Sequence, residues 1–343
     1  MTAAVLAGVG GAGGIAADLG LIVVAAVGLW FGSGLLVDGA VALAERVGLS
    51  GTVIGLTVVA VGTSAPELVV TFEAGLAGRA DIAVGNVVGS NVFNLGFILG
   101  GLAVAGGVPT SPTVARRDGP VLLGVSVLVT AFLFDGHLGR AEGGVLVAVW
   151  VAYVLVLLWR QRSADRATVD VEEAGVDAAV EAAVPLDAEG LAAPERWPLW
   201  KAVGALAAGL VLLLGSARLL VVSASDLARL AGIGEWVIGL TVVAAGTSMP
   251  EFATAAAAAR RGSHGVSVGT LLGSDLSNLL LALGGAAVLR PLTLGVAVLP
   301  NFVPLVLAVA LVVGLSLSGE SLSRRDGVLL VAVALARWIV PLL

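Results

Sequence analysis

Apolar runs of about 20 residues recur along the whole chain, separated by charged residues or by Pro and Gly. A helix of this length spans the hydrocarbon core of a bilayer. Only 12% of the 343 residues are charged, about half the share in a soluble domain, and the mean hydropathy is +1.07. We therefore predict an all-α polytopic membrane protein. An ordinary cytosolic enzyme, a nucleic-acid binder and a disordered protein are excluded.

The apolar runs form two groups of five, on either side of an acidic stretch at 161–197. This stretch holds nine acids and three bases, so it accounts for the whole net charge of −6. We interpret it as a solvated, poorly ordered linker between a first unit at 1–160 and a second at 198–343. The ten predicted spans are 19–45, 51–77, 81–106, 118–135, 142–160, 199–229, 234–259, 265–289, 296–317 and 325–342.

The two units resemble each other at a fixed offset of 184 residues. The eight residues 53–60 recur letter for letter at 237–244, and Gly-Thr-Ser-x-Pro-Glu occurs at both 62–67 and 246–251. Over 53–95 and its counterpart, 21 of 43 positions are identical without a gap. A shared bias toward Val, Leu and Ala gives scattered matches, not an ordered motif. We interpret the similarity as a gene duplication.

Five spans per unit is an odd number, so the second unit must insert upside down relative to the first. Twelve Arg and Lys residues fall in one set of alternate loops, and only Arg79, Arg140, Arg229 and Arg290 in the other. This bias predicts both termini outside and the acidic linker in the cytoplasm of a plasma-membrane protein. Inverted repeats with interrupted helices are a recurring architecture of secondary transporters.

The repeated Gly-Thr-Ser-x-Pro-Glu motif places oxygen atoms in the middle of an apolar span. Pro66 has no backbone N–H, so we expect the helix to break near Gly62 and to free its carbonyl. Thr63 and Ser64 add hydroxyls, and Glu67 adds a carboxylate one turn past Ser64. The second copy supplies Thr247, Ser248 and Glu251. Hard oxygen ligands of this kind suit Ca²⁺ or Na⁺, and acids inside a membrane are functional candidates.

The next span carries further polar residues, spaced four apart and so on one helical face. They are Asn86, Ser90 and Asn94, with Thr270, Ser274 and Asn278 as counterparts. These side chains either complete an oxygen cage around the two glutamates or form hydrogen bonds between helices. The small-xxx-small pairs Gly85/Gly89 and Gly269/Gly273 predict close helix packing.

Several other polar residues are weaker candidates. Asp275 follows Ser274 where the first unit has Asn91, and could tune the site, pair with a base or bind an ion directly. Glu73 lies on another face from Glu67 and fits an interfacial or packing role. A proton relay through His137 and His264 is not expected, since both lie near loops.

The paired motifs resemble those of the sodium/calcium exchanger family of the Ca²⁺/cation antiporter superfamily, in its prokaryotic type. The resembling residues are 62–67 with 85–94, their copies at 246–251 and 269–278, and the loops 116–119 and 324–327. The resemblance implies ten transmembrane helices in two inverted five-helix halves, with access alternated by sliding of the first and sixth helices. It implies ion ligands at Glu67, Glu251, Thr63, Thr247, Ser64, Ser248, Ser90, Ser274, Asn94 and Asn278.

Glu67 and Glu251 together balance one Ca²⁺ or two Na⁺, whereas a third Na⁺ would leave excess positive charge in a low-dielectric place. The leading hypothesis is exchange of Ca²⁺ for Na⁺ by alternating access. H⁺-coupled antiport of Ca²⁺ or another divalent cation is an alternative. A cation channel, which needs a continuous pore, is an alternative from another class.

We do not expect an enzyme, because the chain has no Cys and no His-Glu-x-x-His motif. No cofactor is expected either, since the bound ions would be cargo. The expected partners are these ions and the lipid bilayer, and no nucleic acid. The sequence carries no signal of oligomeric state.

Overall fold

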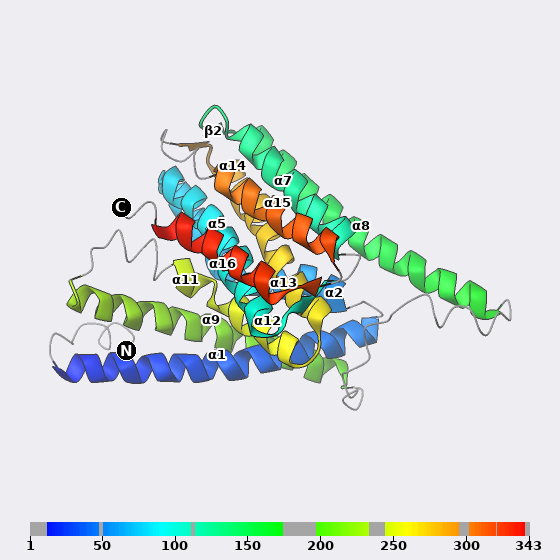
Figure 1. Ribbon diagram of the computed structural model, residues 1–343, viewed down its shortest axis with the longest axis horizontal. Coiled ribbons are helices and arrows are strands. Elements are labelled where there is room, and N and C mark those ends of the chain that lie inside the picture. The colour runs from blue at the N-terminus through cyan, green and yellow to red at the C-terminus, as the bar shows by residue number, and fades with distance from the viewer. Residues whose placement is uncertain are drawn as a thin grey trace.

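The structure is a computed structural model that describes residues 12–47, 51–110, 114–173, 197–232, 244–294, 302–319 and 321–339. These residues form helices almost throughout, together with four very short strands. Figure 1 shows α1 and α9 lying side by side along one edge, while the other helices gather into a bundle beside them.

In the first half of the chain, the longest helices come at the beginning and the end. Three segments, named η, are π-helical, with a wider turn than an α-helix. The elements are α1 (Ala12–Val47), α2 (Gly51–Ile54), η1 (Gly55–Val59), α3 (Ala60–Thr63), α4 (Ala65–Leu76), α5 (Ala80–Phe93), η2 (Asn94–Leu99), α6 (Gly100–Gly106), β1 (Val108–Pro109), η3 (Val114–Asp118), α7 (Gly119–Phe132), β2 (His137–Leu138) and α8 (Arg140–Glu173).

The second half repeats this order wherever it is described. A π-helical segment again follows the second helix of the central pair, and it begins at Asn278, the counterpart of Asn94. The elements are α9 (Leu199–Leu230), α11 (Ala244–Thr247), α12 (Met249–Arg260), α13 (His264–Ser277), η5 (Asn278–Ala282), α14 (Leu283–Leu289), β3 (Leu292–Thr293), α15 (Phe302–Ser318), β4 (Ser321–Leu322) and α16 (Arg324–Ile339).

Each of the ten predicted ranges contains helical structure. The main difference lies after residue 160, where α8 continues to Glu173 and so enters the stretch predicted as a linker. The rest of that stretch, 174–196, lies outside the described residues, as does most of the repeated segment 237–244. Among the described residues, five helices are long and apolar enough to cross a membrane, or six with the bent pair α3 and α4.

Large apolar side chains on the outer helices face away from the protein. Val23 and Phe31 on α1 are 62% and 63% exposed, and Val211 on α9 is 72% exposed. Such surfaces are unfavourable in water and favourable in lipid. The helices that carry them are therefore those of an integral membrane protein.

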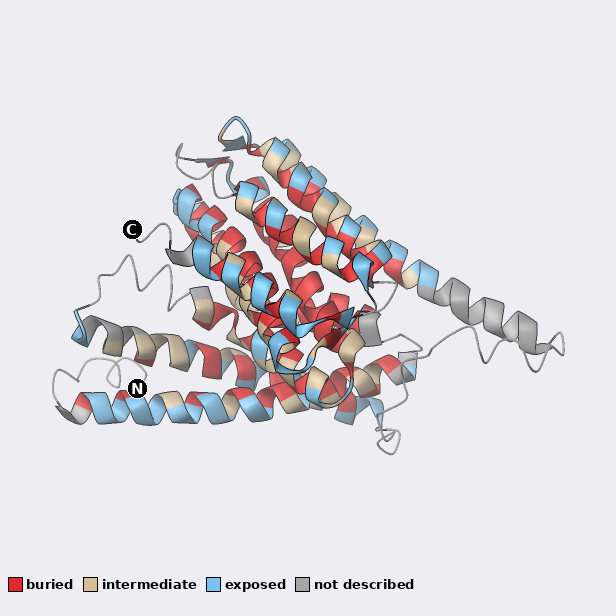
Figure 2. Ribbon diagram, viewed as in Figure 1, coloured by how far each residue is buried: buried red, intermediate tan, exposed pale blue. Residues whose placement is uncertain are grey.

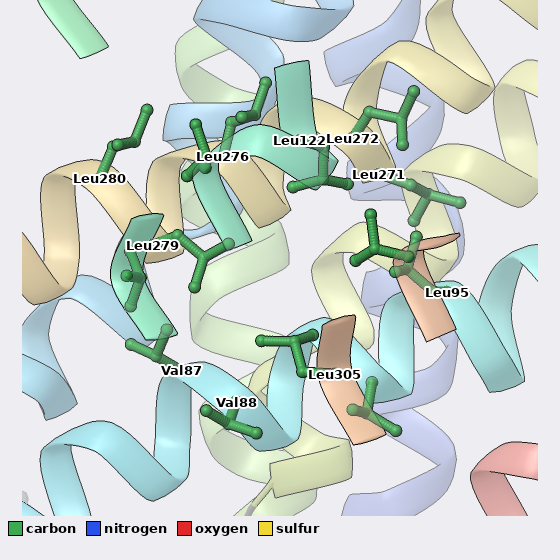
Figure 3. Packing of buried hydrophobic residues seen from close by; sticks show 14 of the residues in the cluster. Val87, Val88, Leu95, Leu122, Leu271, Leu272, Leu276, Leu279, Leu280 and Leu305 are labelled. Atoms are coloured by element: carbon green, nitrogen blue, oxygen red, sulfur yellow. The ribbon is translucent and has the colours of Figure 1, made fainter. Parts of the chain in front are cut away.

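The core is built around the central helix pair of each half. In the most apolar stretch of the span His264–Leu289, which contains α13, 83% is buried, against 22% in the corresponding stretch of α9. Figure 2 shows buried residues concentrated in the middle of the bundle, where α13 runs. Leu271, Leu279, Leu95 and Leu305 belong to one buried cluster that joins both halves (Figure 3). The two halves thus share this core.

Glycines let α1 and α9 pack with their backbones in contact. A Cβ added at Gly39 would stand 2.6 Å from the backbone nitrogen of Leu206, and one at Gly32 would stand 3.0 Å from that of Leu213. As residue numbers fall along α1 they rise along α9, so the two helices run antiparallel.

The four strands pair across the halves in a reciprocal way. β1 pairs with β4, and β2 pairs with β3, both antiparallel. Under the 184-residue offset β3 is the counterpart of β1, and β4 of β2. Because β1 and β2 flank α7, while β3 and β4 flank α15, these counterpart helices must run in opposite directions. Two glycine contacts are related in the same reciprocal way. Gly143 packs against Gly284, and their counterparts in the opposite halves, Gly327 and Gly100, pack against each other.

Candidate ion-binding site

The repeated motif breaks its helix at a serine in both halves. In the first half, α3 ends at Thr63 and α4 begins at Ala65, and the segments on either side of Ser64 differ in direction by 57°. Ser248 has the same backbone conformation, with ψ 6° against 8° for Ser64. We predicted the break near Gly62, which is two residues too early. Pro66 is tolerated in the first turn of α4, where no N–H is needed, so the break falls just before that turn.

Both repeated glutamates lie in the first turn of the helix after the break. Glu67 belongs to α4 and Glu251 to α12. Their side chains are buried, with 1% and 0% exposed. The amino-terminal end of a helix favours a carboxylate because its N–H groups carry partial positive charge. The break therefore gives each buried acid partial support from the backbone.

Each glutamate contacts a serine of the opposite half. The Ser64 hydroxyl lies 3.0 Å from Oε1 of Glu251, and the Ser248 hydroxyl donates to Oε1 of Glu67 at 3.1 Å. Exchanging the two halves by the 184-residue offset turns one contact into the other. The motifs, far apart in the sequence, thus meet at one place.

The helices that follow complete this arrangement. Ser274 on α13 lies 3.3 Å from Oε1 of Glu251 and 2.8 Å from the Ser64 hydroxyl. Asn94, at the start of η2, donates its amide to the Ser274 hydroxyl at 3.2 Å. Ser64, Glu251, Ser274 and Asn94 therefore form one buried polar network, and the Glu67–Ser248 contact belongs to the same buried region.

Four carboxylate and amide oxygens of the predicted ligands are buried and have no hydrogen-bond partner among the described residues. Burying a polar atom without a partner is costly, and native structures leave few such atoms. Carboxylate and amide oxygens of this type suit Na⁺ and Ca²⁺ as ligands. The atoms are Oε2 of Glu67, Oε2 of Glu251, Oδ1 of Asn94 and Oδ1 of Asn278.

The two threonines of the motif lie beside the opposite glutamates. Thr63 approaches Glu251, and Thr247 approaches Glu67, again as a reciprocal pair. The Thr63 hydroxyl also lies 3.2 Å from the carbonyl oxygen of Ala60 in its own helix.

Two predicted residues of α5 are placed differently from the rest. Ser90 is fully buried, but its hydroxyl has no hydrogen-bond partner in the described part of the chain, unlike that of its counterpart Ser274. Asn86 donates to the carbonyl oxygen of Glu67 and to the Thr71 hydroxyl, at 3.2 and 3.0 Å. Asn86 therefore links α5 to α4 by hydrogen bonds, which was the alternative prediction for these polar side chains.

The close packing that we predicted at the glycines of this helix pair is confirmed for Gly273. A Cβ at Gly273 would stand 2.7 Å from the backbone of Leu56. At Gly85 and Gly89, nothing in the described residues lies within 4 Å of such an atom. The counterpart of the segment that Gly273 contacts lies at 237–243, outside the described residues, so the prediction for Gly85 and Gly89 stays a prediction.

Sequence reasoning left out Asn91 and gave Asp275 too little weight. Asp275 is fully buried, and its Oδ1 accepts a hydrogen bond from Asn94 at 2.9 Å. Asn91 accepts from Asn278 at 3.2 Å and donates to the carbonyl oxygen of Asp275 at 3.2 Å. The sequence did contain a signal for these two residues. Positions 91 and 94, like 275 and 278, are three apart, so Asn91 and Asp275 share a helical face with the predicted ligands Asn94 and Asn278.

Other acidic residues and both histidines lie away from this network. Glu73 is exposed on α4, in keeping with the interfacial role predicted for it. His137 is exposed and contacts Thr293. Within the described ranges, no three His, Asp or Glu side chains converge as a metal-holding group. The site is therefore a mixture of carboxylate, amide and hydroxyl oxygens.

A buried oxygen site of this kind, formed by two broken helices inside a bundle of apolar helices, defines a helical membrane transporter. The chain belongs to the sodium/calcium exchanger protein family, whose model matches residues 18–159 and 201–337. This is a family of transporters and antiporters, not of enzymes.

Two curated relatives and one solved structure illustrate the similarity. The chain is 30% identical to the sodium/calcium exchanger MaX1 of Methanosarcina acetivorans over 335 residues, which cover 90% of this chain and 94% of MaX1. It is 34% identical to the inner membrane protein YrbG of Escherichia coli K12 over 271 residues, 79% of each chain. The sodium-calcium exchanger NCX_Mj, in crystals soaked without Na⁺ and Ca²⁺, matches with a TM-score of 0.76 at 26% identity, covering 95% of this chain and 99% of NCX_Mj.

Proposed function

We propose that this protein is a secondary active transporter that exchanges Ca²⁺ for Na⁺ across the membrane by alternating access. The observation that carries the proposal is the pair of buried glutamates, each with a carboxylate oxygen that no hydrogen bond satisfies within the described residues. The relatives MaX1 and NCX_Mj are named as sodium/calcium exchangers, and NCX_Mj structures come from crystals soaked with Na⁺ and Ca²⁺ or Sr²⁺.

The proposed ligands are the residues that the sequence predicted, and their burial supports the proposal. Both ions would use the same two glutamates, so that binding of one excludes the other. Exclusion of this kind makes the transporter exchange ions instead of leaking them. The proposed set is Glu67, Glu251, Thr63, Thr247, Ser64, Ser248, Ser90, Ser274, Asn94 and Asn278, all at most 7% exposed.

The proposed architecture is ten transmembrane helices in two inverted five-helix halves. The antiparallel directions of α7 and α15, the exchanged strand pairs and the exchanged glycine contacts all support it. With the Arg and Lys distribution of the sequence, this architecture places both termini outside and the acidic linker in the cytoplasm of a plasma-membrane protein.

The α1 and α9 pair is the proposed moving part. The two helices pack on each other over much of their length, and they contact the rest of the bundle mainly through α12 and the short helices before Ser64 and Ser248. Sliding of this pair past the glutamate-bearing helices would expose the site first to one side of the membrane and then to the other.

The test is transport by the purified full chain in lipid vesicles. Vesicles loaded with Na⁺ should accumulate radioactive Ca²⁺ when diluted into a Na⁺-free medium, and they should not do so with equal Na⁺ on both sides. Uptake driven by a pH gradient and indifferent to Na⁺ would replace Na⁺ with H⁺ as the coupling ion. Ca²⁺ flux that needs no counter-ion would identify a channel and contradict the proposal.

A further inference from the structure

The two halves differ in charge at one pair of equivalent positions inside the polar network. Asn91 on α5 corresponds to Asp275 on α13. Each accepts a hydrogen bond from an asparagine of the opposite half, at 3.2 Å from Asn278 and at 2.9 Å from Asn94. The same contact is therefore made twice, once to a neutral amide and once to a carboxylate.

The Asp275 carboxylate lacks a compensating positive charge in the described part of the chain. It is fully buried, and its second oxygen, Oδ2, has no hydrogen-bond partner there. Arg117 pairs with Asp118 and Arg261 with Asp38, and neither pair involves Asp275. The nearest charge that acts on it is that of Glu251, which has the same sign. A buried acid in this situation is unfavourable in its charged form unless a cation accompanies it.

A second unpartnered oxygen belongs to the residue that contacts Asp275. Asn94 uses its amide nitrogen for both Ser274 and Asp275, while its Oδ1 is buried and has no hydrogen-bond partner in the described ranges. Asn94 thus bridges Asp275 to the serine beside Glu251. Oxygen ligands and an unbalanced negative charge occur together at this end of the network.

We propose that Asp275 and Asn94 form a cation subsite that takes one Na⁺, beside the ions held by Glu67 and Glu251. The inference rests on the proposed exchange function and deepens it. A single carboxylate with neutral oxygen ligands balances a monovalent ion, and the absence of a three-acid group in the described residues fits two adjoining subsites instead of one crowded site.

This subsite changes the charge count made from the sequence. Glu67 and Glu251 alone carry −2, whereas Asp275 brings the buried carboxylate charge to −3. Three negative charges balance three Na⁺, so one Ca²⁺ would exchange for three Na⁺ and each cycle would move one net charge. Without Asp275, two Na⁺ would exchange for one Ca²⁺ and the cycle would be electroneutral.

The experiment measures how membrane potential changes Na⁺-driven Ca²⁺ accumulation, using the full chain in vesicles clamped with K⁺ and valinomycin. For one net charge per cycle, about 59 mV shifts the equilibrium Ca²⁺ gradient about tenfold. We expect this shift in the wild type and none in Asp275→Asn. An electroneutral wild type, or a variant that keeps the full shift, would overturn the inference while the exchange function stands.

Two further variants serve as controls. Asp135→Asn removes an exposed carboxylate outside the network and should keep the full shift. The double variant Asn91→Asp, Asp275→Asn moves the charge to the equivalent place in the other half and should restore the shift. Loss of the shift in Asp135→Asn would mean that surface charge, not the subsite, produces it, and would also overturn the inference.

A direct count of bound Na⁺ covers the case in which Asp275→Asn does not transport. Equilibrium binding of radioactive Na⁺ to the purified chain in detergent should show one ion fewer per protein in the variant than in the wild type. Equal counts would contradict the subsite. Absence of Na⁺-driven Ca²⁺ uptake by the wild type itself would instead contradict the proposed function.

Discussion

The ten proposed ligands form five identical pairs in sequence, but the two halves differ in their contacts. Glu251 has two serine hydroxyls at its Oε1, from Ser64 and Ser274, whereas Glu67 has one, from Ser248. Ser90 is the counterpart of Ser274, yet it makes no corresponding bond among the described residues. Duplication therefore supplied two copies of each ligand, and the packing around them gave Glu251 more hydrogen bonds to serine than Glu67.

The largest expected effect tests what the halves have in common. Glu67→Gln and Glu251→Gln should each reduce Na⁺-driven Ca²⁺ uptake by about 100-fold, because loss of one buried charge of a matched set costs about 3 kcal/mol or more. Initial uptake rates in vesicles measure this loss. Glu73→Gln, an exposed position on the same helix as Glu67, should stay within about twofold of the wild type. Activity in either site variant comparable to that of the control would remove the glutamates from the mechanism.

The next effect concerns the contact between the halves at α1 and α9. A Cβ at Gly209 would stand 2.5 Å from the backbone nitrogen of Leu36, whereas at Gly204 on the same helix nothing described lies within 4 Å. Gly209→Ala should lower the free energy of unfolding by about 1–3 kcal/mol, because the two backbones must separate. Gly204→Ala should be neutral or raise it by up to about 1 kcal/mol. Denaturant unfolding in detergent separates the two, and equal stabilities would contradict backbone contact at Gly209.

A smaller effect distinguishes the two glutamates. Ser64 contacts both Glu251 and Ser274, whereas Ser248 contacts Glu67. We expect Ser64→Ala to weaken the apparent Ca²⁺ affinity about tenfold and Ser248→Ala about threefold, in line with about 0.7 kcal/mol for each hydrogen bond lost. Ca²⁺ titrations of the initial uptake rate provide the comparison. A larger loss in Ser248→Ala would mean that Glu67 is the better connected acid during transport.

The smallest effect belongs to a contact that only one half possesses. Arg261 after α12 lies 3.1 Å from Asp38 on α1, with both side chains partly exposed. The equivalent positions in the other half are Ala77 and Val222, which cannot pair. Because solvent screens such pairs, a double-mutant cycle with Asp38→Asn and Arg261→Gln should give a coupling below about 1 kcal/mol. A coupling above about 2 kcal/mol would instead make this pair a structural clamp on α1.

Most of the fold followed from local properties of the sequence. Helix content and approximate bounds depend on apolar length, and the break in the motif depends on Pro66, so both were predictable to within a few residues. The end of α8 was not, because charged and polar residues still form a good helix beyond the apolar span.

The sequence alone determined that the chain lies in a membrane and that two duplicated glutamates interrupt its apolar spans, because hydropathy and an ordered repeat need no coordinates to be recognised. Only the tertiary structure decided which oxygens meet. The Ser64–Glu251 and Ser248–Glu67 contacts join residues more than 180 positions apart, and the burial of Asp275 beside Asn94 depends on how α13 packs against η2. Such contacts are set by the packing of whole helices, so no local pattern around Asp275 could show that its charge belongs to the site.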